Sequence, residues 1–230
     1  MINSSVILLV LSVAYHSPAP NAYIEQNVNV LTEQGISQKL SQSDPDLNKG
    51  VIDLALRAYK KAFFQGKVKN PMLTIIDYSV PSNQQRMWIF DMQNDILVLK
   101  TYVAHGQNSG RGTLPYKFSN EMWSKESSLG TYITEGTYMG HKRYSLNLEG
   151  LEQNLNSNAY SRRVVVHGAW YVEPSYIKGR GHAGCSWGCP AVAASLAESI
   201  INTIKNGSVL FAYYPDHYFL THSQYTLFSY

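Results

Sequence analysis

The chain has 230 residues, enough for one substantial domain, because single hydrophobic cores commonly extend over about 100–200 residues. Hydrophobic residues make up 44 % of the sequence and aromatic residues 12 %, so burial can offset the entropy cost of ordering, which argues against a disordered chain. The 19 basic and 16 acidic residues leave a formal net charge of +3 without any Lys/Arg-rich run, which argues against a nucleic-acid-binding protein.

Residues 1–22 have the pattern of an export signal. The apolar run over 6–14 is shorter than the roughly 20 residues that cross a bilayer, but it fits the apolar region of a secretory signal peptide. No Lys or Arg precedes Val6, so an uncleaved apolar anchor and a buried N-terminal strand remain alternatives. We expect an exported protein of the periplasm or cell envelope, with no stable membrane insertion after cleavage.

Residues 23–54 are interpreted as a polar arm followed by the start of a helix. The segment 21–42 is rich in Asn, Gln and Ser with few apolar positions, which predicts at most a weak helix and a linker or loosely docked arm. A clearer helix follows, with Asp44 as N-cap, Pro45 as first helical residue and its end near Gly66. Its apolar residues recur at a spacing of three to four: Leu47, Val51, Leu54, Ala55, Ala58 and Ala62.

From Leu73 onward the apolar pattern becomes that of strands. Alternating or short apolar runs predict strands over 73–78, 86–92, 96–104, 131–135, 144–148 and 163–167. Turns are predicted at 93–95 and at 136–141, a helix from Pro190 to Asn206-Gly207, and a last strand over 208–214. The expected fold is mostly β, of the α+β class, with one domain over 55–215 and a tail over 216–230.

The chemistry is expected at Cys189. If Pro190 begins a helix, Cys189 is its N-cap, where unpaired N–H groups and the helix dipole stabilise a thiolate. A lowered thiol pKa makes cysteine a nucleophile at neutral pH. Gly188 leaves room for a substrate carbonyl and for backbone N–H groups to face its oxygen. Cys189 is therefore predicted to attack an acyl group.

A cysteine enzyme of this kind needs a base, and His167 is the candidate. It ends a strand-like run and precedes Gly168, a position where functional side chains are often displayed. Ser186 could orient the imidazole by a hydrogen bond. His105, also followed by glycine, competes as base or lines the cleft.

The pattern His167-Gly168, then Ser186-x-Gly188-Cys189 after a loop, resembles the active-site signature of the bacterial L,D-transpeptidases, cysteine enzymes of peptidoglycan cross-linking. The resemblance extends over about 55–215 and is carried by LTIIDYS (73–79), YVAHG (102–106), SSLGTY (127–132), RVVVHG (163–168) and SWGCPAV (186–192). It implies a β-sandwich of mixed sheets with a few flanking helices.

The resemblance also implies roles for residues. Cys189 would be the acylated nucleophile, His167 the general base, and the backbone around Gly188 and Cys189 the oxyanion hole. The substrate would be a peptidoglycan tetrapeptide stem, held as a thioester and transferred to an amine to give a 3–3 cross-link. Trp187 stands where most members have His, and Ala191 where many have Asn or Arg, as in a sub-branch with Ser-Trp-Gly-Cys-Pro.

Further residues are candidates for substrate contact. His105 would line the cleft, and Arg180 would hold a stem carboxylate by charge-assisted hydrogen bonds, although a solvated loop explains Arg180 as well. Tyr132 and Trp187 would pack on the substrate, or belong to the core as aromatic residues of sheet proteins commonly do.

Several alternatives stay open. Cys185 and Cys189 could form a disulfide in an oxidising compartment, or bind zinc with His167 and His182. Water as acceptor would give an L,D-carboxypeptidase or endopeptidase, and a wall-binding protein could keep the scaffold without catalysis. We expect an enzyme that is a monomer, binds peptidoglycan stem peptides, and uses no metal and no organic cofactor.

Overall fold

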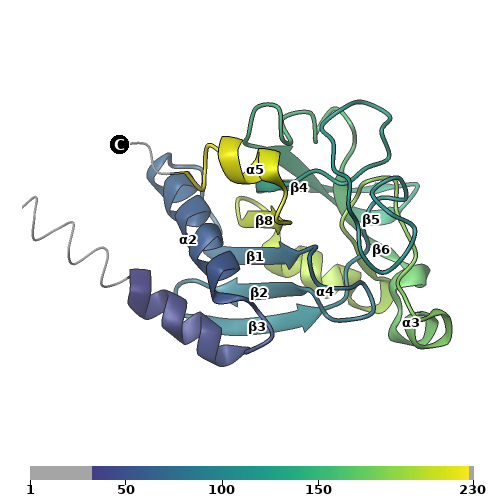
Figure 1. Cartoon of the computed structure of the whole chain (residues 1–230), viewed down its shortest axis with the longest axis horizontal. Coiled ribbons are helices and arrows are strands. Elements are labelled where there is room, and N and C mark those ends of the chain that lie inside the picture. The colour runs from purple at the N-terminus through teal and green to yellow at the C-terminus, as the bar shows by residue number, and fades with distance from the viewer. Residues whose placement is uncertain (1–32, 228–230) are drawn as a thin grey trace, which may run out of the picture.

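The computed structural model describes residues 33–227, and their strands form one mixed sheet (Figure 1). The strand order is β3-β2-β1-β8-β4-β5-β6-β7, with β1–β8 and β6–β7 parallel and the other neighbours antiparallel. The strands are β1 (Met72–Asp77), β2 (Met87–Asp91), β3 (Ile96–Thr101), β4 (Gly130–Gly140), β5 (Arg143–Gly150), β6 (Val165–Ala169), β7 (Ala191–Ala193) and β8 (Val209–Tyr213).

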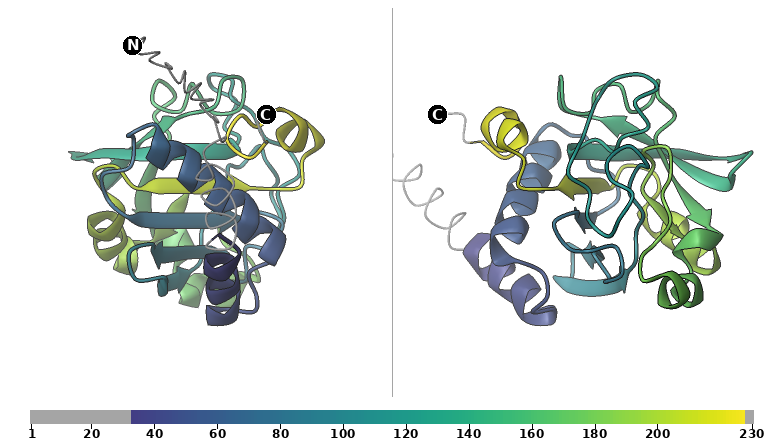
Figure 2. Two further views of the ribbon diagram at one scale, coloured as in Figure 1. Left: turned by 90° about the vertical axis from the view of Figure 1, so that its left-hand side faces the viewer. Right: turned by 45° about the vertical axis from the view of Figure 1, so that its right-hand side comes forward.

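A helix over 33–43 and five named helices flank the sheet. The named ones are α2 (Lys49–Phe64), the 3-10 helix η1 (Trp170–Val172), α3 (Pro174–Arg180), α4 (Ala194–Ile204) and α5 (His217–His222). The predicted fold class, a mostly β fold of mixed strands with a few flanking helices, is confirmed, and the described strands form one sheet where the resemblance implied a sandwich of mixed sheets. Figure 1 and the right-hand view of Figure 2 show α2 and α3 at opposite ends of the molecule. None of the helices within 33–227 has the length and apolar character of a membrane span.

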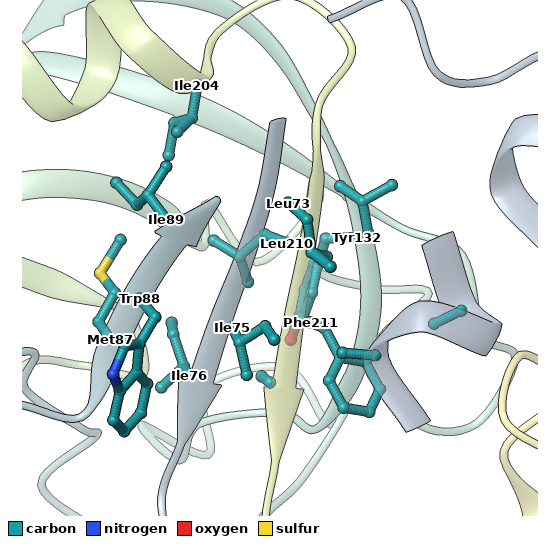
Figure 3. Packing of buried hydrophobic residues seen from close by; sticks show 14 of the residues in the cluster. Leu73, Ile75, Ile76, Met87, Trp88, Ile89, Tyr132, Ile204, Leu210 and Phe211 are labelled. Atoms are coloured by element: carbon teal, nitrogen blue, oxygen red, sulfur yellow. The ribbon is translucent and has the colours of Figure 1, made fainter. Parts of the chain in front are cut away.

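The core lies on both faces of the central strands. Helices α2 and α4 both contact β1, and Leu73, Ile75 and Ile76 are fully buried. In Figure 3, Ile204 of α4 lies beside Ile89 of β2. A strand that is covered on both faces has apolar residues in a continuous run, which is why 73–76 does not alternate strictly.

The prediction of a loosely docked arm is wrong for residues 33–42. These residues belong to the helix over 33–43, whose Leu40 is fully buried in the core and whose Ile36 packs against it. The sparse apolar positions suffice because Ile36 and Leu40, four residues apart, lie on the same face of the helix and both contact the core. The predicted signal at 1–22 lies outside the described residues.

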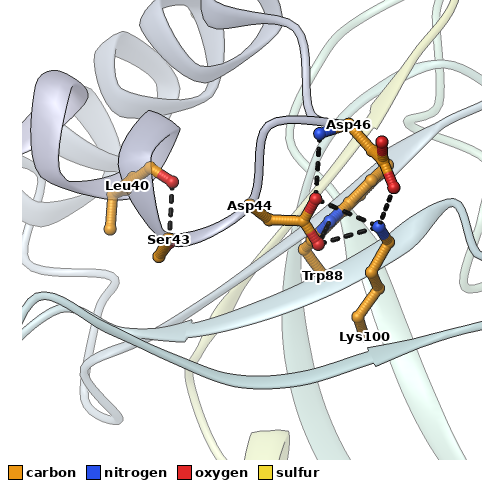
Figure 4. A network of polar contacts seen from close by, with 6 residues as sticks. All are labelled: Leu40, Ser43, Asp44, Asp46, Trp88 and Lys100. Atoms are coloured by element: carbon orange, nitrogen blue, oxygen red, sulfur yellow. Dashed lines mark hydrogen bonds and ion pairs between the residues drawn. The ribbon is translucent and has the colours of Figure 1, made fainter.

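The predicted N-cap Asp44 is also wrong. Helix α2 begins at Lys49, and Asn48 caps it by accepting a hydrogen bond from the Gly50 N–H. The Asp44 carboxylate instead binds across the molecule to β2 and β3, accepting from Trp88 Nε1 at 3.1 Å and from Lys100 Nζ (Figure 4). Burial alone would raise the pKa of Asp44, but these hydrogen bonds and that of the Asp46 N–H lower it.

Two further boundaries differ from the sequence prediction. Strand β4 continues through the expected turn at 136–141 to Gly140, because a register shift between Thr134 and Thr137 keeps it paired with β5. Pro190 does not begin a helix: residues 191–193 pair with β6 as strand β7, and α4 starts only at Ala194.

The C-terminal residues up to Leu227 pack onto the domain. Phe219 of α5 is fully buried, and Ser223 Oγ donates to Glu152 Oε2 at 2.6 Å. The other oxygen of the same carboxylate accepts from the Thr131 N–H at 2.7 Å, beside the start of β4. The described part of the segment predicted as a tail is therefore packed onto the domain.

Replacing Asp44 by alanine should destabilise the protein by about 2–3 kcal/mol, because the buried indole N–H of Trp88 and the half-buried Lys100 lose their acceptor. Asp46 is a matched control, since it also binds Lys100 but its side chain is 76 % exposed. Asp46→Ala should cost less than about 0.5 kcal/mol. Urea unfolding of the three proteins measures both values, and equal losses would contradict this account.

Candidate active site

A cavity of about 500 Å³ lies where β6, the loop before β7 and the β4–β5 hairpin turn meet. The structure brings His167, Ser186, Trp187 and Cys189 together in its wall. The remaining lining residues are Met122, Trp123, Lys125, Tyr138, Lys142, Ser161, Arg162, Arg163, Val165, Tyr171 and Cys185.

The parallel pairing of β6 and β7 sets the relation between His167 and Cys189. His167 is opposite Ala191, so Cys189 is only two residues before the register partner of the histidine. On the other side of β6, His167 is opposite Ser145 of β5. Both of these neighbouring strands hold the backbone of His167, which gives its side chain a fixed position at the cavity.

The imidazole of His167 has a defined tautomer. Its Nδ1 lies 2.9 Å from the Gly168 carbonyl oxygen, which can only accept, so Nδ1 carries the proton and Nε2 keeps a lone pair. Burial lowers the pKa of His167, the hydrogen bond to Gly168 opposes this, and the charge of Lys142 adds to the lowering. His167 is therefore a neutral imidazole at pH 7 that can accept a proton at Nε2.

Cys189 does not lie at a helix N-terminus, so the predicted stabilisation of its thiolate by a helix dipole is wrong. The thiol is partly buried and donates to the Arg163 carbonyl at a sulfur–oxygen distance of 3.6 Å. Burial raises the pKa of Cys189, while the Val165 N–H and the charges of Lys142 and Arg162 oppose the rise. The thiol is thus protonated at neutral pH and depends on a base for activation.

Ser186 and Gly188 fix the turn that carries the thiol. Ser186 Oγ donates to the Cys189 carbonyl at 2.6 Å and accepts from the Gly188 N–H at 3.1 Å, so this side chain holds the turn. The predicted hydrogen bond from Ser186 to the imidazole of His167 is not formed. Gly188 has φ +112°, and a Cβ there would lie 2.6 Å from the Glu126 carbonyl oxygen. Only glycine fits this position without a shift of the backbone.

The turn is also anchored from below. The Ser186 N–H donates to the His105 carbonyl at 2.9 Å, and the Gln107 N–H donates to the Ser186 carbonyl at 2.8 Å. Arg162 Nη2 donates to the Glu126 carbonyl at 2.6 Å, the same oxygen that a Cβ at position 188 would meet. These contacts place the thiol on a backbone with little freedom.

Three predicted substrate-binding residues lie outside the cavity wall. His105 is fully buried, with Nδ1 accepting from Arg86 at 2.8 Å and Nε2 donating to the Gly110 carbonyl at 2.7 Å. Burial lowers the pKa of His105 to about 4, so it stays neutral. Tyr132 is a core residue whose hydroxyl donates to the Ser128 carbonyl, and Arg180 is exposed at the end of α3.

Both cysteines are free thiols in the structure, and within residues 33–227 no group of three His, Cys, Asp or Glu side chains is arranged to hold a metal ion. Cys185 shares the cavity wall with Cys189, but its thiol lies towards the Gly110 carbonyl at 3.6 Å.

Sequence reasoning missed the basic residues of the wall: Lys125, Lys142, Arg162 and Arg163. It also missed Trp123, which is 83 % exposed beside the cavity. The adjacent arginines directly before the β6 apolar run were a usable signal. Lys142 carried none, because only the fold brings the β4–β5 turn to the thiol.

A family model for the L,D-transpeptidase catalytic domain matches residues 43–213. Solved structures with similarity include an L,D-transpeptidase from Mycobacterium smegmatis, at 12 % identity over 63 % of this chain and 59 % of that chain, with a TM-score of 0.40. L,D-transpeptidases from Stackebrandtia nassauensis (14 % identity, 78 % and 76 % coverage, TM-score 0.37) and Xylanimonas cellulosilytica (11 %, 78 % and 91 %, 0.35) are also similar.

This chain thus corresponds to about three fifths of the length of the Mycobacterium smegmatis protein. The curated proteins include no significant match. The family model alone covers well over half of the chain, including the strands and the turn that form the cavity. The chain belongs to the L,D-transpeptidase catalytic-domain family.

Proposed function

We propose that this chain is a cysteine-dependent peptidoglycan L,D-transpeptidase that forms 3–3 cross-links. The observation that carries the proposal is that one cavity wall contains both the Cys189 thiol and a neutral His167 whose Nε2 can accept a proton. No acidic residue is needed behind the histidine, because the Gly168 carbonyl holds Nδ1–H in place.

In the proposed first half-reaction, Nε2 of His167 takes the thiol proton as the Cys189 sulfur attacks the carbonyl carbon between the diamino acid and the terminal D-alanine. The C–N bond then breaks, and the imidazolium returns the proton to the departing D-alanine amine. The stem remains as a thioester on Cys189. An acceptor amine, deprotonated by His167, attacks the thioester, and the C–S bond breaks to release the cross-linked product and the thiol.

The oxyanion of each tetrahedral intermediate needs N–H donors. The Gly188 N–H already donates to Ser186 Oγ, so we assign the primary donor to the Cys189 amide. The hydrogen bond from Ser186 Oγ to the Cys189 carbonyl keeps this amide fixed relative to the sulfur. Ser186 and Gly188 are therefore positioning residues in this mechanism.

The same chemistry with water as acceptor would make a carboxypeptidase. We further propose that the transpeptidase is located in the cell envelope and acts on peptidoglycan stems as a monomer.

The decisive experiment is intact-mass analysis of wild type, Cys189→Ala and Cys185→Ala after incubation with tetrapeptide stems, followed by product analysis. A stem-sized adduct, less D-alanine, is expected on wild type and on Cys185→Ala, whose altered thiol lines the same cavity. Cys189→Ala should form none, and its turnover should fall by at least about 10³-fold. Adduct formation in Cys189→Ala would sink the proposal, and tripeptide as the main product despite added amine would replace transpeptidation by hydrolysis.

The pH dependence follows from the two pKa shifts. Because the pKa of Cys189 lies above the ordinary thiol value of 9.0, the thiolate fraction and the rate of alkylation by iodoacetamide should rise through pH 9 without a plateau. Acyl transfer should decline only below pH 6.5, because the pKa of His167 is lowered from that value and the base is neutral above it. The alkylation rate of Cys189 is measured at each pH by peptide mass. A plateau of this rate below pH 7 would contradict the raised pKa of the thiol.

A further inference from the structure

The cavity around the thiol has charge of one sign. Four basic side chains line it, those of Lys125, Lys142, Arg162 and Arg163, and no Asp or Glu is among its described lining residues. The nearby Glu126 carboxylate is paired with Lys117 at 2.8 Å. A concave wall with only positive charge concentrates anions.

Arg162 is not available to a ligand. Its guanidinium donates to the carbonyls of Ser119 and Glu126, both at 2.6 Å, and to the hydroxyls of Ser124 and Ser128. These contacts fix the loop against which Gly188 packs. Lys125 is also engaged, since its ammonium lies 4.6 Å from the centre of the exposed Trp187 ring.

Lys142 and Arg163 differ from these two residues. Both are exposed, and neither side chain has a hydrogen bond or an ion pair with any residue in the described part of the chain. Arg163 directly follows Arg162 in sequence, yet its backbone rather than its side chain makes the local contact, accepting the Cys189 S–H. Two cations in the wall of the cavity thus have no neutralising partner within residues 33–227.

Their positions flank the reacting pair from opposite ends of β6. Arg163 lies two residues before β6, which begins at Val165. In the antiparallel register Ser145 is opposite His167 and Asn147 opposite Val165, so the β4–β5 turn with Lys142 lies beyond the other end, past His167. A ligand that lies across Cys189 and His167 would have one cation near each end.

We infer that Lys142 and Arg163 are specificity-determining residues that bind carboxylates of the donor peptide, one on each side of the scissile bond. The inference rests on the proposed function, in which the leaving D-alanine has a free carboxylate. Arg163 can bind a carboxylate through two parallel N–H donors, whereas Lys142 provides a compact charge that follows a mobile group. The enzyme then selects donors with free carboxylates on both sides over donors whose carboxylates are amidated.

The first test uses thiol reagents and needs no peptidoglycan. Iodoacetate and iodoacetamide both alkylate a thiolate with loss of iodide. The rate with anionic iodoacetate divided by the rate with neutral iodoacetamide at Cys189 is therefore independent of the thiol pKa and reports the attraction of an anion. In a Cys185→Ala background, Lys142→Met and Arg163→Gln should each lower the ratio at least about threefold. Lys178→Met and Arg180→Gln, which remove exposed charges of α3 outside the cavity wall, should leave it unchanged.

The second test compares kcat/KM for tetrapeptide donors with free carboxylates and for donors amidated at one end or the other. Each variant should lose about tenfold in kcat/KM on the donor with free carboxylates. The loss should be much smaller on the donor that is amidated at the carboxylate which the replaced residue binds, because that charge is already absent. Equal losses on all donors, or losses matched by the α3 controls, would overturn the inference.

The two tests separate the inference from the proposed function. If no donor acylates Cys189 but the reagent ratio still depends on Lys142 and Arg163, the proposed function fails and the anion site remains. If donors acylate Cys189 and neither the ratio nor the donor preference changes in the variants, the proposed function remains and this inference fails.

Discussion

The parallel pairing of β6 with β7 is the constraint on which the rest of the site depends. It sets His167 opposite Ala191 and so fixes the separation between the imidazole and the turn that carries Cys189. The turn itself follows no regular ladder, and its backbone is held by the bridge between Gly106 and Ser186 and by the two hydrogen bonds of Ser186 Oγ. A change in the register of β7 against β6 would therefore change the position of Cys189 relative to His167.

Burial decides the electrostatic state of this pair. It raises the pKa of Cys189 and lowers that of His167, so both groups are neutral at pH 7. Neutral groups avoid the desolvation cost of a buried ion pair, and in the mechanism that we propose the proton moves only when an acyl carbon accepts the sulfur. The positive charges of Lys142 and Arg162 oppose the rise in the thiol pKa without removing it.

The adjacent arginines illustrate how one charge type performs two tasks. Arg162 is half-buried and its hydrogen bonds hold carbonyl and hydroxyl groups of the 119–128 loop, so its removal would loosen the wall behind Gly188. Arg163 is exposed in the cavity wall, and its side chain has no hydrogen bond or ion pair with any of the described residues. A one-residue difference in position therefore separates the supporting role of Arg162 from the recognition role that we propose for Arg163.

The sequence by itself determined the elements whose signal is local. The apolar runs of β1 to β6 and β8 and the helical spacing of α2 are properties of neighbouring residues, so period and composition predict them. The cysteine preceded by glycine and the histidine after an apolar run are also local patterns, so the sequence is enough to indicate both candidates.

Only the tertiary structure decided the features that depend on distant partners. The sequence predicts a helix that starts at Pro190, but residues 191–193 instead pair with β6 as a parallel strand, and this pairing has no signal in the sequence. Asp44 does not cap a helix but accepts hydrogen bonds from Trp88 and Lys100, and His105 lies in the interior beside Arg86. Lys142 lies in the same cavity wall as the thiol because the register of β5 with β6 places the β4–β5 turn there. Such contacts join residues far apart in the chain. Their energies depend on burial, which cannot be predicted from the neighbouring residues in the sequence.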